Sequence, residues 1–117
     1  MQTENKVKLV IWDLDDTFWH GTIAEEKITI NLNALEVVKT LNKRGIINTI
    51  VSKNSYEVVK KKLLSEGYWD LFIMPSISYE PKGERIKSLI KKFNLRTSNV
   101  MFIDDNNNNL MEAKYYN

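Results

Sequence analysis

The sequence predicts an α/β domain with a mostly parallel central sheet, and two patterns along the chain support this prediction. Four short segments are almost continuously apolar, which is typical of strands that are buried on both faces. They are residues 7–12, 46–51, 71–74 and 100–103. The segments between them place apolar residues at helical spacing. Because the chain opens on a strand and then alternates helix and strand, we expect the strands to run parallel.

Three helices are expected between these strands, each with an apolar stripe along one face. The stripes are Leu35, Val38 and Leu41; Val59, Leu63 and Leu64; and Ile86, Leu89, Ile90 and Phe93. Gly45 and Gly67 follow the first two stripes at positions that suit a helix C-cap. A further helix is expected to begin near Asn107, because Asn106 and Asn107 suit a turn and an N-cap.

Residues 18–30 fit neither the strand pattern nor the helix pattern. The segments "GTI" and "KITI" flank charged residues there and predict a small β-hairpin. We expect residues 1–117 to form a single domain. A sheet of this kind normally continues into another strand after the last expected helix. The chain is therefore expected to be either this domain alone or the N-terminal part of a longer protein.

The composition argues against several classes of protein. A net charge of +2 favours neither a nucleic-acid partner nor an acidic membrane surface. The absence of cysteine excludes disulfides, thiolate zinc sites and cysteine nucleophiles, and a single histidine cannot build a histidine-rich metal site. No apolar run approaches the length of a membrane span, and the N-terminal "MQTENKVK" lacks the apolar core of a signal peptide. We therefore expect a cytoplasmic protein.

Five of the six aspartates follow two of the predicted strands. Asp13, Asp15 and Asp16 come directly after the first strand, and Asp104 and Asp105 after the fourth. Ligands of open parallel sheets bind outside the carboxyl ends of the strands, so both clusters are expected to face one crevice.

Gathering these carboxylates is unfavourable unless a cation offsets their mutual repulsion. Oxygen ligands favour a hard ion, namely Mg²⁺. The alternative is that the aspartates only cap turns and helix N-termini, which explains one or two of the five. Ser52 follows the second strand and Lys82 opens the third helix, so a hydroxyl and an ammonium group are expected beside the acids. Such an arrangement suits phosphate binding.

In their order, these residues resemble the motifs of the haloacid dehalogenase superfamily of phosphohydrolases. The first motif is "VIWDLDDT", and the last is an apolar strand that ends in an acidic pair. The matching residues are Asp13, Asp15 and Thr17, then Ser52, then Lys82, then Asp104 and Asp105. The resemblance spans nearly the whole chain and implies a Rossmann-like three-layer sandwich.

The segments "DLDDTFWHG", "SKNS", "EPKGERI" and "FIDDNNNNLMEA" further resemble the FkbH-like branch and the related magnesium-dependent phosphatases of subfamily IIIC. About 30 residues separate Thr17 from Ser52, and about 30 separate Ser52 from Lys82. Neither gap has room for a large cap domain. The resemblance therefore implies a minimal cap, formed by the hairpin alone.

The resemblance also implies a role for each motif residue. Asp13 would be the nucleophile that forms an aspartyl-phosphate, and Asp15 would be the general acid and base. The chain must then leave strand geometry after Asp13, because alternate residues of a strand point to opposite faces. Ser52 and Lys82 would bind the phosphoryl oxygens. Asn54 would either donate to the substrate or cap the following helix.

Mg²⁺ would be held by the Asp13 carboxylate, the Asp15 backbone carbonyl and Asp105, with Asp104 acting through water or toward Lys82. Three neighbouring residues complete the expectations for this region. Asp16 is expected to be structural, Thr17 to hydrogen-bond the backbone of its turn, and Trp19 either to close over substrate or to cover the core.

The leading function is a Mg²⁺-dependent phosphohydrolase or phosphoryl transferase that acts on a small phosphorylated metabolite. The alternative is an FkbH-like transfer of a phosphoglycerate-derived glyceryl unit to an acyl carrier protein. A receiver-type signalling domain should carry an aspartate at the end of its third strand, and "LFIMPSIS" has none. An inactive binding module is disfavoured because every predicted catalytic group is intact.

Overall fold

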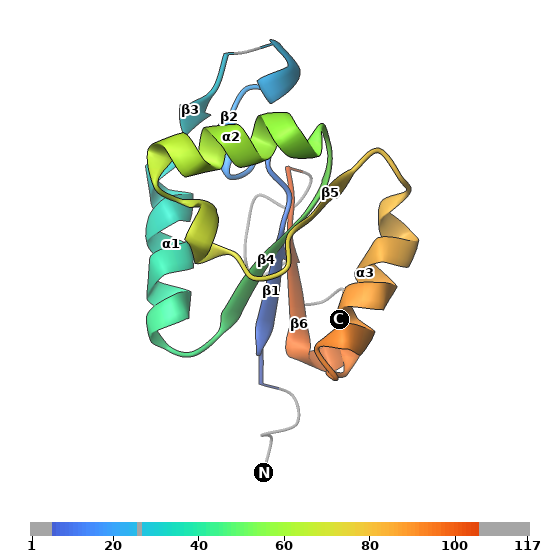
Figure 1. Cartoon of the computed structure of the whole chain (residues 1–117). Coiled ribbons are helices and arrows are strands. Elements are labelled where there is room, and N and C mark those ends of the chain that lie inside the picture. The colour runs from blue at the N-terminus through green and yellow to red at the C-terminus, as the bar shows by residue number, and fades with distance from the viewer. Residues whose placement is uncertain (1–5, 26, 106–117) are drawn as a thin grey trace.

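The computed structural model describes residues 6–25 and 27–105, and a four-stranded sheet forms its centre (Figure 1). The strands lie in the order β5-β4-β1-β6, and every neighbouring pair runs parallel. They are β1 (Leu9–Trp12), β4 (Ile47–Lys53), β5 (Ser76–Ser78) and β6 (Val100–Ile103). The helices are α1 (Leu32–Lys43), α2 (Tyr56–Glu66) and α3 (Lys82–Lys92). The predicted α/β class with a parallel sheet is confirmed.

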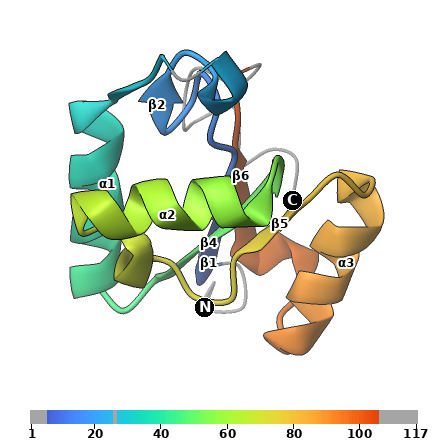
Figure 2. The ribbon, with the colours of Figure 1, turned by 45° about the horizontal axis from the view of Figure 1, so that its top comes forward.

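The helices form one layer on each face of the sheet. Figures 1 and 2 show α1 and α2 on one face and α3 on the other. Alternate residues of β1 serve the two sides, as strand geometry requires. Val10 and Trp12 pack in the core beneath α1 and α2, whereas Leu9 and Ile11 pack with Leu89 of α3. The domain thus has two hydrophobic cores separated by the sheet. Within the described residues, no helix has the length and apolar character needed to cross a bilayer.

The ends of the helices follow from local sequence. The Asn31 side chain caps α1 by accepting from the amides of Asn33 and Ala34, each at 3.1 Å. Gly67 ends α2 with a left-handed backbone (φ 80°), which glycine adopts without steric cost. The apolar stripe predicted for α2 is wrong at Leu64, which is exposed. Val59 and Leu63 are the residues of that stripe that pack into the core.

The third strand lies later in the chain than predicted. Residues 71–74 do not form it, because a short 3-10 turn (Trp69–Leu71) occupies the start of this run. Phe72 is buried against the core of α1 and α2, and Met74 has a positive φ of 51°, which interrupts extended geometry. The strand that pairs with β4 is β5, of which Ile77 alone is buried.

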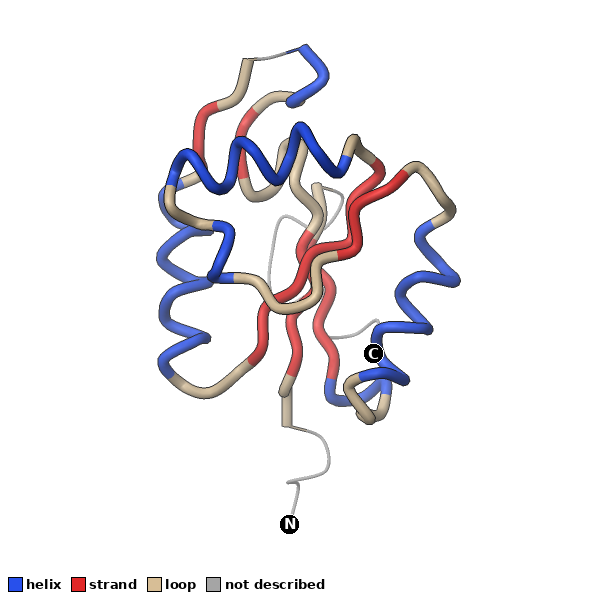
Figure 3. The backbone as a smooth tube through the Cα atoms, viewed as in Figure 1, coloured by secondary structure: helices blue, strands red, loops and turns tan. Residues whose placement is uncertain are grey.

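A small hairpin follows β1 and stands at the carboxyl ends of the strands (Figure 3). Its strands are β2 (Trp19–His20) and β3 (Thr29–Ile30), which pair antiparallel. The predicted pairing of "GTI" with "KITI" is wrong in register, since Gly21 turns the chain with φ 90° and Ile23–Glu25 forms a 3-10 turn. The presence of a small hairpin in this segment is confirmed. The helix expected near Asn107 lies outside the described residues.

Candidate active site

The first motif forms a tight turn directly after β1. The backbone amides of Thr17, Phe18 and Trp19 all donate to one carbonyl, that of Leu14, at 3.0, 2.9 and 3.2 Å. The chain therefore leaves strand geometry after Asp13, as expected from the chemistry. This turn lets two acids that are close in sequence approach the same end of the sheet.

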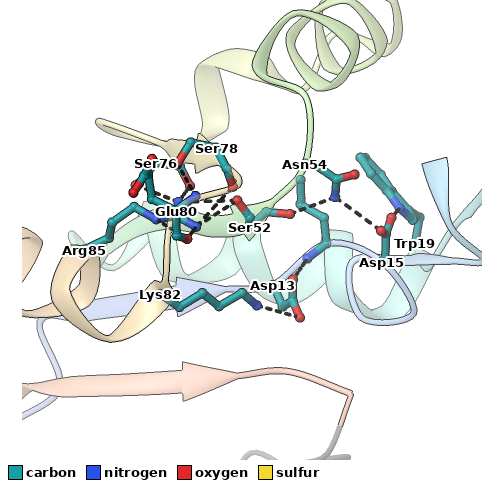
Figure 4. A network of polar contacts seen from close by, with 11 residues as sticks. Asp13, Asp15, Trp19, Ser52, Asn54, Ser76, Ser78, Glu80, Lys82 and Arg85 are labelled. Carbon is teal, nitrogen blue, oxygen red and sulfur yellow. Dashed lines mark hydrogen bonds and ion pairs between the residues drawn. The ribbon is translucent and has the colours of Figure 1, made fainter. Parts of the chain in front are cut away.

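Asp13 forms an ion pair with Lys82 from the start of α3. Its Oδ2 lies 3.1 Å from Nζ, and its Oδ1 accepts from the amide of Leu14 at 2.8 Å (Figure 4). The side chains of Asp13 and Lys82 remain 19% and 33% exposed. The carboxylate is thus held in one orientation and can still be reached from solvent. Residues 69 positions apart in sequence are brought together as predicted.

Asp15 accepts hydrogen bonds from three donors, two in the hairpin and one after β4. Its Oδ1 accepts from the Trp19 indole at 2.8 Å and from the amide of Ile23 at 3.0 Å. Its Oδ2 accepts from the Asn54 amide group at 3.2 Å. Trp19 is fully buried, so it covers the core, and its ring N–H also orients Asp15. The sequence predicted that Trp19 either closes over substrate or covers the core, and it did not predict the hydrogen bond to Asp15.

Ser52 and Asn54 lie buried at the end of β4. The Asn54 Nδ2 donates to Ser52 Oγ at 2.9 Å and also reaches Asp15, so Asn54 links two of the predicted site residues. The cap of α2 is Ser55, whose hydroxyl accepts from the amide of Val58 at 3.4 Å. The alternative in which Asn54 caps the helix is therefore wrong.

Arg85 is a site residue that sequence reasoning missed. Its guanidinium donates to the carbonyls of Ser52, Ser76, Ser78 and Glu80 at 2.8 to 3.3 Å, and to the Ser76 hydroxyl at 3.0 Å. It therefore joins the ends of β4 and β5 to the loop just before Lys82 (Figure 4).

Burial lowers the pKa of Arg85 below its usual value, and the charge of Glu80 opposes this change. Arginine nevertheless remains protonated in proteins. No signal in the sequence distinguishes Arg85, because Lys82 lies nearer the start of α3 and the helix dipole disfavours both cations alike.

Asp16 and Thr17 have no visible part in the site. Asp16 is exposed with φ 57°, and its carboxylate accepts from the amide of Gly21 at 2.8 Å. It closes the hairpin, so the expected structural role is confirmed. The bond that Thr17 was expected to make to the backbone of its turn is made by its amide, to the carbonyl of Leu14, whereas its buried hydroxyl has no hydrogen-bond partner among the described residues.

The predicted metal ligands come from β1 and β6, which are neighbours in the sheet. Trp12 pairs with Ile103, so Asp13 and Asp104 follow adjacent strands at the same level. Asp104 is half-buried and Asp105 is exposed. Among residues 6–25 and 27–105, no group of three or more His, Cys, Asp or Glu side chains is gathered as a metal centre. The metal site implied by the resemblance uses only two carboxylates as direct ligands, those of Asp13 and Asp105. Asp15 would contribute its backbone carbonyl instead of its side chain.

Fold and site together define an α/β enzyme domain with its reactive groups at the carboxyl ends of a parallel sheet. The family model of haloacid dehalogenase-like hydrolases matches residues 22–116, and the chain belongs to this family. A comparison with curated proteins found no significant match.

Solved structures with the same fold include several phosphatases. The N-terminal part of the protein BF1531 from Bacteroides fragilis, which contains a phosphatase domain complexed with Mg, superposes with a TM-score of 0.78 at 26% identity. The match covers 88% of this chain and 32% of that one, so the chain spans about a third of its length.

Two more distant neighbours are octulosonate 8-phosphate phosphatases. The enzyme from Moraxella catarrhalis, complexed with magnesium, phosphate and a KDO molecule, gives a TM-score of 0.62 at 21% identity, over 86% of this chain and 59% of that one. The cobalt-bound enzyme from Haemophilus influenzae gives 0.67 at 17% identity, over 86% and 60%. At these identities the likeness shows the fold alone.

Proposed function

We propose that the protein is a Mg²⁺-dependent phosphohydrolase that acts on a small phosphorylated metabolite through an aspartyl-phosphate on Asp13. The observation that carries this proposal is the Asp13 carboxylate, which is ion-paired with Lys82 at 3.1 Å and still accessible to solvent. Membership of the hydrolase family and the Mg-bound phosphatase domain from Bacteroides fragilis support it.

The proposed reaction assigns a step to each acid. One oxygen of Asp13 attacks phosphorus, and the bond from phosphorus to the ester oxygen breaks. Asp15 gives its proton to the departing alcohol. It then takes a proton from the water that cleaves the aspartyl-phosphate, so orthophosphate is released and Asp13 is regenerated. Lys82 and Ser52 would bind the phosphoryl oxygens. Asn54 would orient the side chains of Ser52 and Asp15 by donating a hydrogen bond to each.

The residues present are chemically suited to Mg²⁺. The donors expected there are the carboxylates of Asp13 and Asp105 and the backbone carbonyl of Asp15, with Asp104 beside them. All are hard oxygen ligands, which Mg²⁺ prefers. When bound, the ion would supply charge neutralisation at the phosphoryl oxygens.

The finer assignment to the FkbH-like branch or to subfamily IIIC remains part of this proposal and rests on sequence resemblance. None of the relatives described above is named as acting on an acyl carrier protein, so we propose hydrolysis rather than transfer to a carrier. A receiver-like or inactive module is further disfavoured by the matched hydrolase family. Stoichiometric release of phosphate and alcohol, with water as the acceptor, would support hydrolysis.

The experiment uses purified protein, Mg²⁺ and an aryl phosphate such as p-nitrophenyl phosphate. We expect Asp13→Asn to lower kcat by at least about a thousandfold, with an unchanged circular dichroism spectrum, because the amide is no nucleophile. Asp16→Asn is the matched control, since the same change falls on the hairpin and its oxygen can still accept from Gly21. Equal rates for Asp13→Asn and the unaltered protein would overturn the proposal.

A further inference from the structure

A groove of about 590 Å³ lies between the hairpin and α2, directly beside the predicted phosphate site. Asn54, which contacts both Ser52 and Asp15, forms part of its lining. The groove therefore borders the predicted phosphate site at Asn54. Its volume is in the range of small-molecule pockets, so it suits a metabolite rather than a macromolecule.

The walls near the phosphate site are apolar. Ile23 and Ile28 line the groove from the hairpin, Val58 from α2, and Tyr79 from the residue after β5. Val58 and Tyr79 are 48% and 69% exposed, so both side chains can be reached from solvent. The groove thus offers an unpartnered apolar surface to whatever group is attached to the phosphate.

The far end of the groove is cationic. Lys61 and Lys62 line it, and none of the described lining residues is acidic. Lys62 is already paired with Glu66 at 3.1 Å, whereas Lys61 is exposed and forms no ion pair with another described residue. Lys61 is therefore the cation in this groove that is available to a ligand.

The order of residues along α2 separates the apolar wall from the cation. Lys61 follows Val58 by three residues within α2, so it lies about 4.5 Å farther along the helix axis at a rise of 1.5 Å per residue. Residues Ser55, Val58, Lys62 and Ser65 lie on the same face of α2, so the groove follows the helix rather than crossing it.

We propose that this groove binds the alcohol part of the substrate, and that the substrate is a phosphate monoester with an apolar segment beside the ester and a carboxylate beyond that segment. The apolar segment lies against Val58 and Tyr79, and Lys61 pairs with the carboxylate. This inference rests on the proposed function, because it takes the phosphate of the ester to lie at Asp13.

The test compares two probes of equal length, the phosphate esters of ω-hydroxyhexanoate and ω-hydroxyhexanamide. We expect KM to be about three- to fivefold lower for the acid than for the amide, as one partly exposed ion pair allows. Added salt should shrink this ratio by screening the pair. Lys61→Met should bring the ratio close to one. Lys91→Met removes the same charge from α3, away from the groove, and should preserve it.

The outcomes separate this inference from the proposed function. Equal KM values for the two probes, or a ratio that survives Lys61→Met, would overturn the groove assignment while leaving the phosphohydrolase intact. If neither the probes nor an aryl phosphate were hydrolysed with Mg²⁺, the proposed function would fail and the groove assignment with it.

Discussion

Arg85 joins the carboxyl ends of β4 and β5 to the loop before α3. Its guanidinium binds the carbonyl of Ser52 at the end of β4, two carbonyls around β5, and the carbonyl of Glu80. Glu80 lies two residues before Lys82, the partner of Asp13. The planar fork of arginine can satisfy several acceptors at fixed angles, which the point charge of lysine cannot do. Arg85 therefore positions both predicted phosphate-binding groups without touching the phosphate itself.

We predict that Arg85→Met lowers kcat/KM by about tenfold or more and destabilises the fold by about 1–3 kcal/mol, because several carbonyls lose their donor. Arg85→Lys should restore part of the stability and less of the activity, since it returns the charge without the fork. Steady-state kinetics and thermal unfolding measure the two effects. An Arg85→Met protein with unchanged kcat/KM would show that these contacts serve stability only.

Several residues of the site could be predicted because they come after successive strands in a recognisable order. Asp13, Ser52 and Lys82 follow from that order, and the structure brings Asp13 and Lys82 together as an ion pair. The contacts from Trp19 and Arg85 could not be predicted. They depend on how side chains from separate elements meet, and local sequence carries no record of that geometry.

At the level of elements, the hairpin is the part of the fold that both shapes the groove and contacts Asp15. It supplies the indole of Trp19 and the amide of Ile23 to that carboxylate. Its turn depends on Gly21, whose φ is 90° and whose hydrogen faces the carbonyl of Lys27. A Cβ built at Gly21 would lie 2.1 Å from that oxygen, far inside the van der Waals limit.

We predict that Gly21→Ala displaces the hairpin and lowers kcat by about tenfold, because Asp15 loses its two donors from this segment. Gly45→Ala is the matched control. Gly45 has a similar φ of 79° but no atom within 4 Å of an added Cβ, so it should show only the backbone strain of about 1 kcal/mol. Comparing kcat and unfolding free energy in the two variants separates the clash from the strain. Equal kcat values in the two would contradict this account of the hairpin.

The elements differ in how well sequence predicted them. β1, β4 and β6 were found because buried parallel strands read as continuous apolar runs. β5 was placed too early, because the apolar run before it contains Phe72, which fills the core from a turn, and Met74, whose positive φ ends extended geometry. Apolar character alone cannot distinguish a strand from a turn that packs inward.

At the scale of the whole molecule, the site lies outside both hydrophobic cores. The larger core packs under α1 and α2, and the smaller one under α3. Trp12 and Asn48 join β1 to β4 within the larger core through a bond of 2.7 Å, and Asn48 continues to the carbonyl of Val38 in α1. These contacts hold the layers together without any of the predicted site residues.

We therefore predict that removing divalent ions with EDTA stops turnover without unfolding the protein. Hydrolysis should fall by at least about a hundredfold and return on addition of excess Mg²⁺. Asp13 keeps Lys82 as a counter-charge when the ion leaves. At about ten times its Kd, the ion adds only about 1.4 kcal/mol of stability, so Tm should fall by less than about 10 °C. Calorimetry with and without EDTA, beside initial rates, tests both parts. Full activity in EDTA would contradict the metal requirement, and loss of the cooperative transition would contradict the separation of site and cores.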